Sequence, residues 1–65
     1  MKMKDFTFAL RSYQSALDIR RNLFGEKHAE TADSYHLLGV AQHALNDFTS
    51  ALQSHQRALD IRLQL

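Results

Sequence analysis

Apolar side chains recur at intervals of three and four residues along nearly the whole chain, which is the spacing of one face of an α-helix. The first run predicts a helix over residues 5–24, with Gly25 just past its end, where a left-handed residue commonly terminates a helix. A second helix is expected after a connector at residues 25–28, and a tight turn at Asn46 and Asp47 separates it from a third, which runs nearly to the C-terminus. The residues expected on the packed faces are Phe6, Ala9, Leu10, Tyr13, Ala16, Leu17, Leu23 and Phe24 in the first helix, Tyr35, Leu38, Gly39, Gln42 and Leu45 in the second, and Phe48, Ala51, Leu52, His55, Ala58, Leu59 and Leu63 in the third.

The first and third predicted helices are copies of one sequence. Residues 5–20 read DFTFALRSYQSALDIR and return 42 residues later as DFTSALQSHQRALDIR, with 12 of 16 positions identical. An internal period of roughly 20–50 residues indicates a solenoid, in which each unit buries its apolar face by stacking on its neighbours. Small residues on the packed faces allow close helix contact, and Gly39 does so although glycine costs about 1 kcal/mol relative to alanine within a helix. The chain is therefore expected to be all-α.

Composition narrows the classes of partner. At 65 residues the chain is one small domain, and its 45% hydrophobic and 23% charged residues are typical of a folded protein. A net charge of +1 argues against nucleic acid or an anionic membrane as a partner. The absence of cysteine excludes disulfides and thiolate zinc sites and favours a cytoplasmic protein. Residues 1–4 resemble the basic start of a signal peptide, but the segment that follows is amphipathic and charged, so neither a signal peptide nor a membrane span is expected.

Candidate chemistry is sparse. His36 and His43 lie seven residues apart, or about 10 Å along a helix, which is too far to share one zinc ion. No two histidines are spaced three or four residues apart, so neither a metal nor another cofactor is expected. The chain also lacks a Gly-x-Ser-x-Gly elbow, a glycine-rich phosphate loop and paired carboxylates, so no enzyme activity is expected. Charged pairs such as Arg57 with Asp60 are expected to form a solvated face.

Eight positions of the second and third helices form a recognisable series: an aromatic residue, a Leu-Gly pair, a turn residue, an aromatic residue, an alanine, another aromatic position and a second alanine. They are Tyr35, Leu38, Gly39, Asn46, Phe48, Ala51, His55 and Ala58. With these residues in register and an internal copy, the chain resembles the tetratricopeptide repeat family. Its 42-residue period resembles in particular the long-repeat branch found in kinesin light chains and nephrocystin-type proteins. The chain departs from the pattern at His55, which replaces an aromatic residue, at Asn46, where glycine is common, and at Ala29, where proline is usual.

The resemblance implies antiparallel helical hairpins that build a right-handed superhelix, with residues 5–24 as the outer helix of one repeat and residues 29–65 as the inner and outer helices of the next. It also implies a protein-binding scaffold whose inner helices line a groove for a peptide or helix of a partner. The groove-facing residues would be Asp33, His36, Leu37, Val40 and His43, or Ala44 in place of the last. No lysine or asparagine stands among them to clamp a peptide carboxylate. The alternative for this stripe is a solvated face without a ligand.

One and a half repeats leave apolar faces uncovered at both ends of the predicted fold. The alternative function is therefore a self-assembling structural unit, and a homo-oligomer is expected, either a dimer or a stack. A helix-swapped dimer is a further arrangement, because the proline missing at Ala29 weakens the break between the first two helices.

Overall fold

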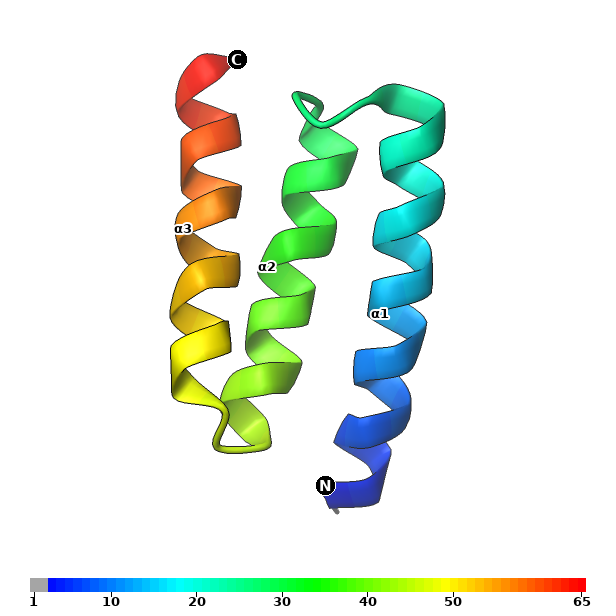
Figure 1. The fold of residues 1–65 in the computed structure, drawn as a ribbon, viewed down its shortest axis with the longest axis vertical. Coiled ribbons are helices and arrows are strands. Elements are labelled where there is room, and N and C mark those ends of the chain that lie inside the picture. Colours follow the sequence, from blue (N-terminus) through cyan, green and yellow to red (C-terminus); the bar gives the residue numbers. More distant parts are fainter. Residues whose placement is uncertain (1–2) are drawn as a thin grey trace.

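A computed structural model describes residues 3–65, with side chains from Asp5 onward, so Met1 and Lys2 of the predicted basic start lie outside the described residues. The chain forms three helices over the described range, α1 (Met3–Phe24), α2 (Ala29–Ala44) and α3 (Phe48–Gln64). They lie side by side with α2 in the middle, and neighbouring helices are antiparallel (Figure 1). α2 packs against both of the others, whereas no Cα atom of α1 comes within 8 Å of one in α3. The predicted all-α class is confirmed, and no helix within residues 3–65 is long and apolar enough to cross a membrane.

The connection between α1 and α2 breaks the helix without a proline. Gly25 has a left-handed φ of 84°, and its N–H donates to the Arg21 carbonyl at 2.9 Å. His28 then caps α2, because its backbone is extended and its Nδ1 accepts from the Glu30 N–H at 3.0 Å. α2 therefore begins at Ala29, the position where the family pattern has proline, and the imidazole of His28 supplies the start signal.

The turn between α2 and α3 follows the sequence-based prediction. Asn46 has a left-handed φ of 65°, which asparagine tolerates better than most residues. Asp47 precedes α3, and its Oδ1 accepts from the Ser50 N–H at 3.4 Å. The Asp47 N–H in turn donates to the Gln42 carbonyl at 2.9 Å, which ties the turn to the end of α2.

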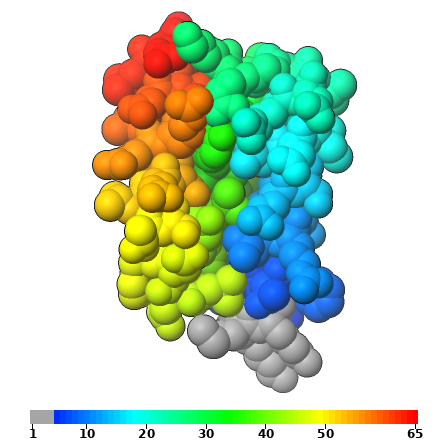
Figure 2. Space-filling view, viewed as in Figure 1, coloured from blue at the N-terminus to red at the C-terminus, as the bar shows by residue number. Residues whose placement is uncertain are grey.

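The core is thin and built largely from small side chains. The buried residues are Leu17 in α1, Thr31, Ala32, Ser34, Leu38, Gly39 and Ala41 in α2, and Ala51, Ser54, Ala58 and Ile61 in α3. A Cβ atom added at Gly39 would lie 2.8 Å from the His55 ring, so the missing side chain lets α2 and α3 approach at this point. The close approach of the helices is visible in Figure 2, where α2 appears only as a narrow band between the side chains of α1 and α3.

Several large apolar residues expected in the core are exposed instead. They are Leu23, Phe24, Phe48, Leu52, Leu59 and Leu63, with exposed fractions from 47% at Phe24 to 76% at Leu63. Conversely, Ile61 was not among the predicted core residues and is only 2% exposed. The reason is that α1 and α3 are sequence copies but turn different faces to α2, α1 the face that contains Leu17 and α3 the face that contains Ala58 and Ile61. Each of these two helices therefore keeps a second apolar face uncovered within residues 5–65.

Candidate functional site

The five residues predicted to contact a peptide are all exposed on α2. Asp33, Leu37 and Val40 follow one another at intervals of four and three residues, so their side chains line one side of the helix. Leu37 is 37% exposed and Val40 is 46% exposed, although α2 is the middle helix of three. Together they form a small apolar surface with a carboxylate one turn away.

α3 borders one flank of this surface. Two of the predicted residues contact α3 through their rings, His36 with His55 at a centroid distance of 5.2 Å and His43 edge-on with Phe48 at 5.1 Å. Sequence spacing alone did not pair these residues, because each contact joins different helices. The two imidazoles give the apolar surface a polar border, and Leu37 and Val40 remain its apolar centre.

Two arginines related by the repeat contact the first half of α2 from opposite neighbours. Arg20 of α1 donates from Nη1 to the Ser34 Oγ at 2.7 Å, and Arg62 of α3 donates from Nη2 to the Asp33 Oδ1 at 3.1 Å. They lie 42 residues apart, as the last residues of the two copies of the Ala-Leu-Asp-Ile-Arg motif. Sequence reasoning missed this pair, although the identity of the two motifs was a signal for it. Asp33 is therefore paired with a cationic side chain of α3.

A polar cluster joins all three helices at the α1–α2 connection. Glu26 accepts on Oε1 from the Tyr35 hydroxyl at 2.8 Å and from Arg57 Nε at 2.9 Å. Its Oε2 lies 2.8 Å from Arg21 Nε. Arg57 thus pairs with Glu26 rather than with Asp60, the partner expected from spacing along one helix, because the connector brings a carboxylate within its reach. One side chain from the connector therefore holds α1, α2 and α3 together.

The cluster shifts the acidity of its members. Partial burial would raise the pKa of Glu26, but the hydrogen bonds from Tyr35 and Arg57 and the charge of Arg21 outweigh it and lower the pKa below its usual 4.5. Burial and the hydrogen bond to Glu26 raise the pKa of Tyr35 above 10. Because the folded state binds protons at Glu26 less readily than the unfolded state, the stability contributed by Glu26 is complete above about pH 4.5 and is lost as the pH falls through the lowered pKa.

Replacing Glu26 by glutamine is expected to lower the free energy of unfolding at pH 7 by about 1–2 kcal/mol, because two guanidinium groups lose a charged acceptor. As the pH falls below about 4.5, the unmodified protein should lose stability more steeply than the variant. Glu30→Gln is the matched control, since the Glu30 carboxylate makes one surface ion pair, 3.6 Å from Arg20, worth less than about 0.5 kcal/mol. Urea denaturation at several pH values measures both, and parallel pH profiles for Glu26→Gln and the unmodified chain would contradict the expectation.

A shallow depression of about 320 Å³ lies beside this cluster. It is lined by Tyr35, Gln42, Ser50, Gln53, Ser54 and Arg57. The Ser54 Oγ donates to the Gln42 Oε1 at 2.6 Å, and an amide cannot act as a general base for a serine nucleophile. Gln42 lies about 180° around α2 from Asp33, so the depression and the predicted peptide surface face opposite sides. Within the part of the chain that the structure describes, no group of three or more His, Cys, Asp or Glu side chains could hold a metal ion.

The antiparallel hairpin of α2 and α3, with Leu38, Gly39, Ala51 and Ala58 buried, has the arrangement that the resemblance implies. A family model described as Tetratricopeptide repeat matches residues 1–64. The chain belongs to the tetratricopeptide repeat family. No curated protein and no solved structure matches it.

Tetratricopeptide repeats are generally non-enzymatic modules that bind other proteins, and this is the general function that the match supports. One tetratricopeptide position at which this chain departs from the pattern is His55. Its half-buried ring adjoins Gly39 and contacts the ring of His36, so the imidazole occupies the space of the usual aromatic residue. The substitution therefore preserves the packing of the hairpin while adding a polar group at its border.

Proposed function

We propose that this chain is a non-enzymatic interaction module that binds a peptide or a helix of a partner protein along the exposed side of α2. The observation that carries the proposal is the pair Leu37 and Val40, which stays exposed at the centre of α2 while α1 and α3 pack against that helix. Membership of the tetratricopeptide repeat family supports a protein ligand in general. The 42-residue spacing of the two copies supports the long-repeat type.

The chemistry of the surface indicates the kind of ligand. Leu37 and Val40 would contact apolar side chains, and His36 and His43 on their border would form hydrogen bonds to the ligand. Lysine and asparagine are absent from the stripe, so a terminal carboxylate is not the group it recognises. We therefore propose recognition of internal apolar residues of a partner, in the cytoplasm, where the lack of cysteine is typical.

Peptides selected from a random library against the unmodified chain provide the test. The double variant Leu37→Asp, Val40→Asp is expected to bind the selected peptides about tenfold more weakly or worse, because a charged side chain replaces each of the two apolar contacts. Leu23→Asp is the matched control, since Leu23 is 71% exposed on α1 and lies outside the stripe. Fluorescence polarisation with labelled peptides measures the affinities. Selected peptides that bind the double variant as tightly as the control would show that the stripe is not the binding site.

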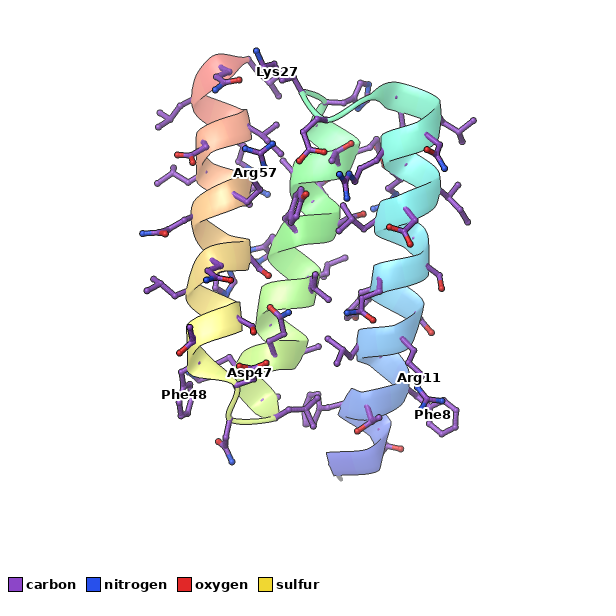
Figure 3. The ribbon with its side chains drawn as sticks, viewed as in Figure 1. Phe8, Arg11, Lys27, Asp47, Phe48 and Arg57 are labelled. Atoms are coloured by element: carbon purple, nitrogen blue, oxygen red, sulfur yellow. The ribbon has the colours of Figure 1, made fainter. Side chains whose placement is uncertain are left out.

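A second candidate function, self-association, is favoured by apolar side chains at two edges of the molecule. These are Phe8, Ile19 and Leu23 on α1 and Phe48, Leu52, Leu59 and Leu63 on α3, all more than half exposed. Phe8 and Phe48 lie at opposite edges in Figure 3. Helix exchange would break the contacts that close the α1–α2 connection, among them the hydrogen bond from Thr31 Oγ1 to the Gly25 carbonyl at 2.7 Å. Contact between edges is therefore the form of self-association that these observations favour.

A further inference from the structure

α3 carries a strip of large apolar side chains that α2 does not cover, which we name the α3 edge. Its members are Phe48, Leu52, Leu59 and Leu63, with exposed fractions of 56%, 59%, 55% and 76%. Their spacing places them on one side of the helix. Four neighbouring large apolar side chains that are all more than half exposed form a patch that is typical of a protein interaction surface.

The internal repeat shows what kind of partner fits this edge. The counterparts of Phe48, Leu52 and Leu59, 42 residues earlier, are Phe6, Leu10 and Leu17. These three are half-buried or buried on α1, and α2 is the helix that α1 packs against within residues 3–65. The α3 edge is thus a copy of a face that packs on a helix in this same structure.

A second copy of the chain cannot supply the packed faces of its α2 as a cover without rearranging. That helix already lies between α1 and α3. α1 is held to it by the hydrogen bond of Arg20 with Ser34, and the connection by the bonds of Glu26. While folded, a second copy offers the open side of its α1, with Phe8, Ile19 and Leu23, and its own α3 edge, which is equally uncovered.

The α3 edge is complementary to itself in the antiparallel orientation. Its members are separated by intervals of four, seven and four residues, which read the same in both directions. We propose that two copies of this chain dimerise through their α3 edges, with Phe48 facing the partner's Leu63 and Leu52 facing the partner's Leu59. Each apolar side chain then meets another apolar side chain across the two-fold axis. The inference rests on the self-association proposed above and is independent of peptide binding by α2.

Polar residues of α3 fit this orientation. Gln56 lies near the centre of the strip, where antiparallel pairing places it next to the Gln56 of the second copy. An amide group both donates and accepts hydrogen bonds, so the two side chains can bind each other. Asp47 caps the start of α3, and Arg62, which also binds Asp33, lies in its last turn, so antiparallel pairing brings the acidic end of one helix to the basic end of the other. A parallel pair would instead place Asp47 beside the partner's Asp47 and Arg62 beside the partner's Arg62.

The edge of α1 fits such a pairing less well. Its open side has the same intervals, with Phe8, Ser12, Ile19 and Leu23. In an antiparallel pair, Ser12 would face the partner's Ile19 twice, which sets a hydroxyl against an apolar side chain. On α3 the corresponding pairs are leucine with leucine. The difference favours α3 as the dimer surface.

The interface is expected to be weak. α3 has 17 residues and is about 25 Å long, so a single helix pair buries less than the roughly 1,200 Å² below which complexes are transient. A dissociation constant in the micromolar range is therefore expected. The chain should be monomeric when dilute and dimeric when concentrated.

Single cysteines test the register directly, because the chain contains none. Leu52→Cys and Leu59→Cys proteins, mixed under mild oxidation, are expected to form a mixed disulfide dimer, since the proposed pairing brings these positions within disulfide reach. Each variant alone should cross-link little, because its two copies would lie seven residues, about 10 Å, apart along the helix axis. Leu23→Cys on α1 is the matched control and should not cross-link preferentially with either variant.

Light scattering over a concentration series is the second measurement. The unmodified chain is expected to reach twice the monomer mass, Leu59→Lys to weaken dimerisation about tenfold or more, and the double variant Leu52→Glu, Leu59→Lys to restore it by pairing opposite charges. A monomer at all concentrations, self-cross-linking of Leu52→Cys alone, or a dimer that Leu59→Lys leaves intact would each overturn the proposal. Circular dichroism checks that the variants stay folded. Peptide affinity measured on the monomeric Leu59→Lys variant tests the α2 surface separately, so failure of one proposal does not imply failure of the other.

Discussion

Ile61→Ala is expected to bring the chain close to unfolding at room temperature. The Ile61 side chain is 2% exposed in the contact of α3 with α2. Truncating a buried isoleucine to alanine costs about 2–5 kcal/mol, because apolar contacts are lost and a cavity remains. A domain of 65 residues has a total stability of about 3–10 kcal/mol. Urea denaturation followed by circular dichroism, at a concentration where the chain is monomeric, measures the loss as a lower midpoint.

Ile19→Ala is the matched control for this prediction. Ile19 is the repeat counterpart of Ile61, in the same Ala-Leu-Asp-Ile-Arg motif, but it is 58% exposed. The same substitution should therefore change stability by no more than about 0.5 kcal/mol. If both variants lost stability equally, the assignment of different packing faces to α1 and α3 would be wrong.

This pair of isoleucines also marks the limit of what the sequence predicts. The three helices and the breaks between them could be predicted, because periodicity, Gly25 and Asn46 are local signals, although α1 begins at Met3 and not at residue 5. Burial could not be predicted by the same means. Equivalent residues in the two copies have opposite environments, such as Leu17, which is 6% exposed, and Leu59, which is 55% exposed. Identical local sequence cannot show which side of an outer helix α2 covers, because that depends on where the neighbouring helices lie.

The candidate site also combines features that the sequence predicts with features that it does not. The exposed stripe on α2 could be predicted, since it is the side opposite the apolar packing face of one helix. The contacts that border and support it join residues far apart in sequence, as with Glu26 and Arg57 or His36 and His55. A connector residue such as Glu26 has no periodic pattern to mark it. Its role depends on the arrangement of all three helices at one end of the fold.

A leucine at Gly39 is expected to cost about 3 kcal/mol of stability. Even a Cβ atom at this position would lie 2.8 Å from both Cε1 and Nε2 of His55, so a larger side chain must push α2 and α3 apart. Leucine is a good helix former, so the loss would not come from helix propensity. Val40→Leu adds one methylene group at the adjacent exposed position and should leave stability nearly unchanged.

Removal of the opposing ring should recover part of this loss. In the double variant Gly39→Leu, His55→Ala, the added side chain can occupy the space of the imidazole, and the two substitutions should couple by about 1–3 kcal/mol. Gly25→Ala provides the contrast, because Gly25 has no atom within 4 Å of an added Cβ and its φ of 84° is the constraint. That variant should lose about 1–2 kcal/mol through backbone strain, and His55→Ala should not restore it. Denaturation midpoints of Gly39→Leu, Gly25→Ala and His55→Ala, and of the two double variants that combine each glycine substitution with His55→Ala, test the expected recovery at Gly39 and its absence at Gly25. Additive losses at Gly39 and His55 would show that close contact is not the reason for the glycine.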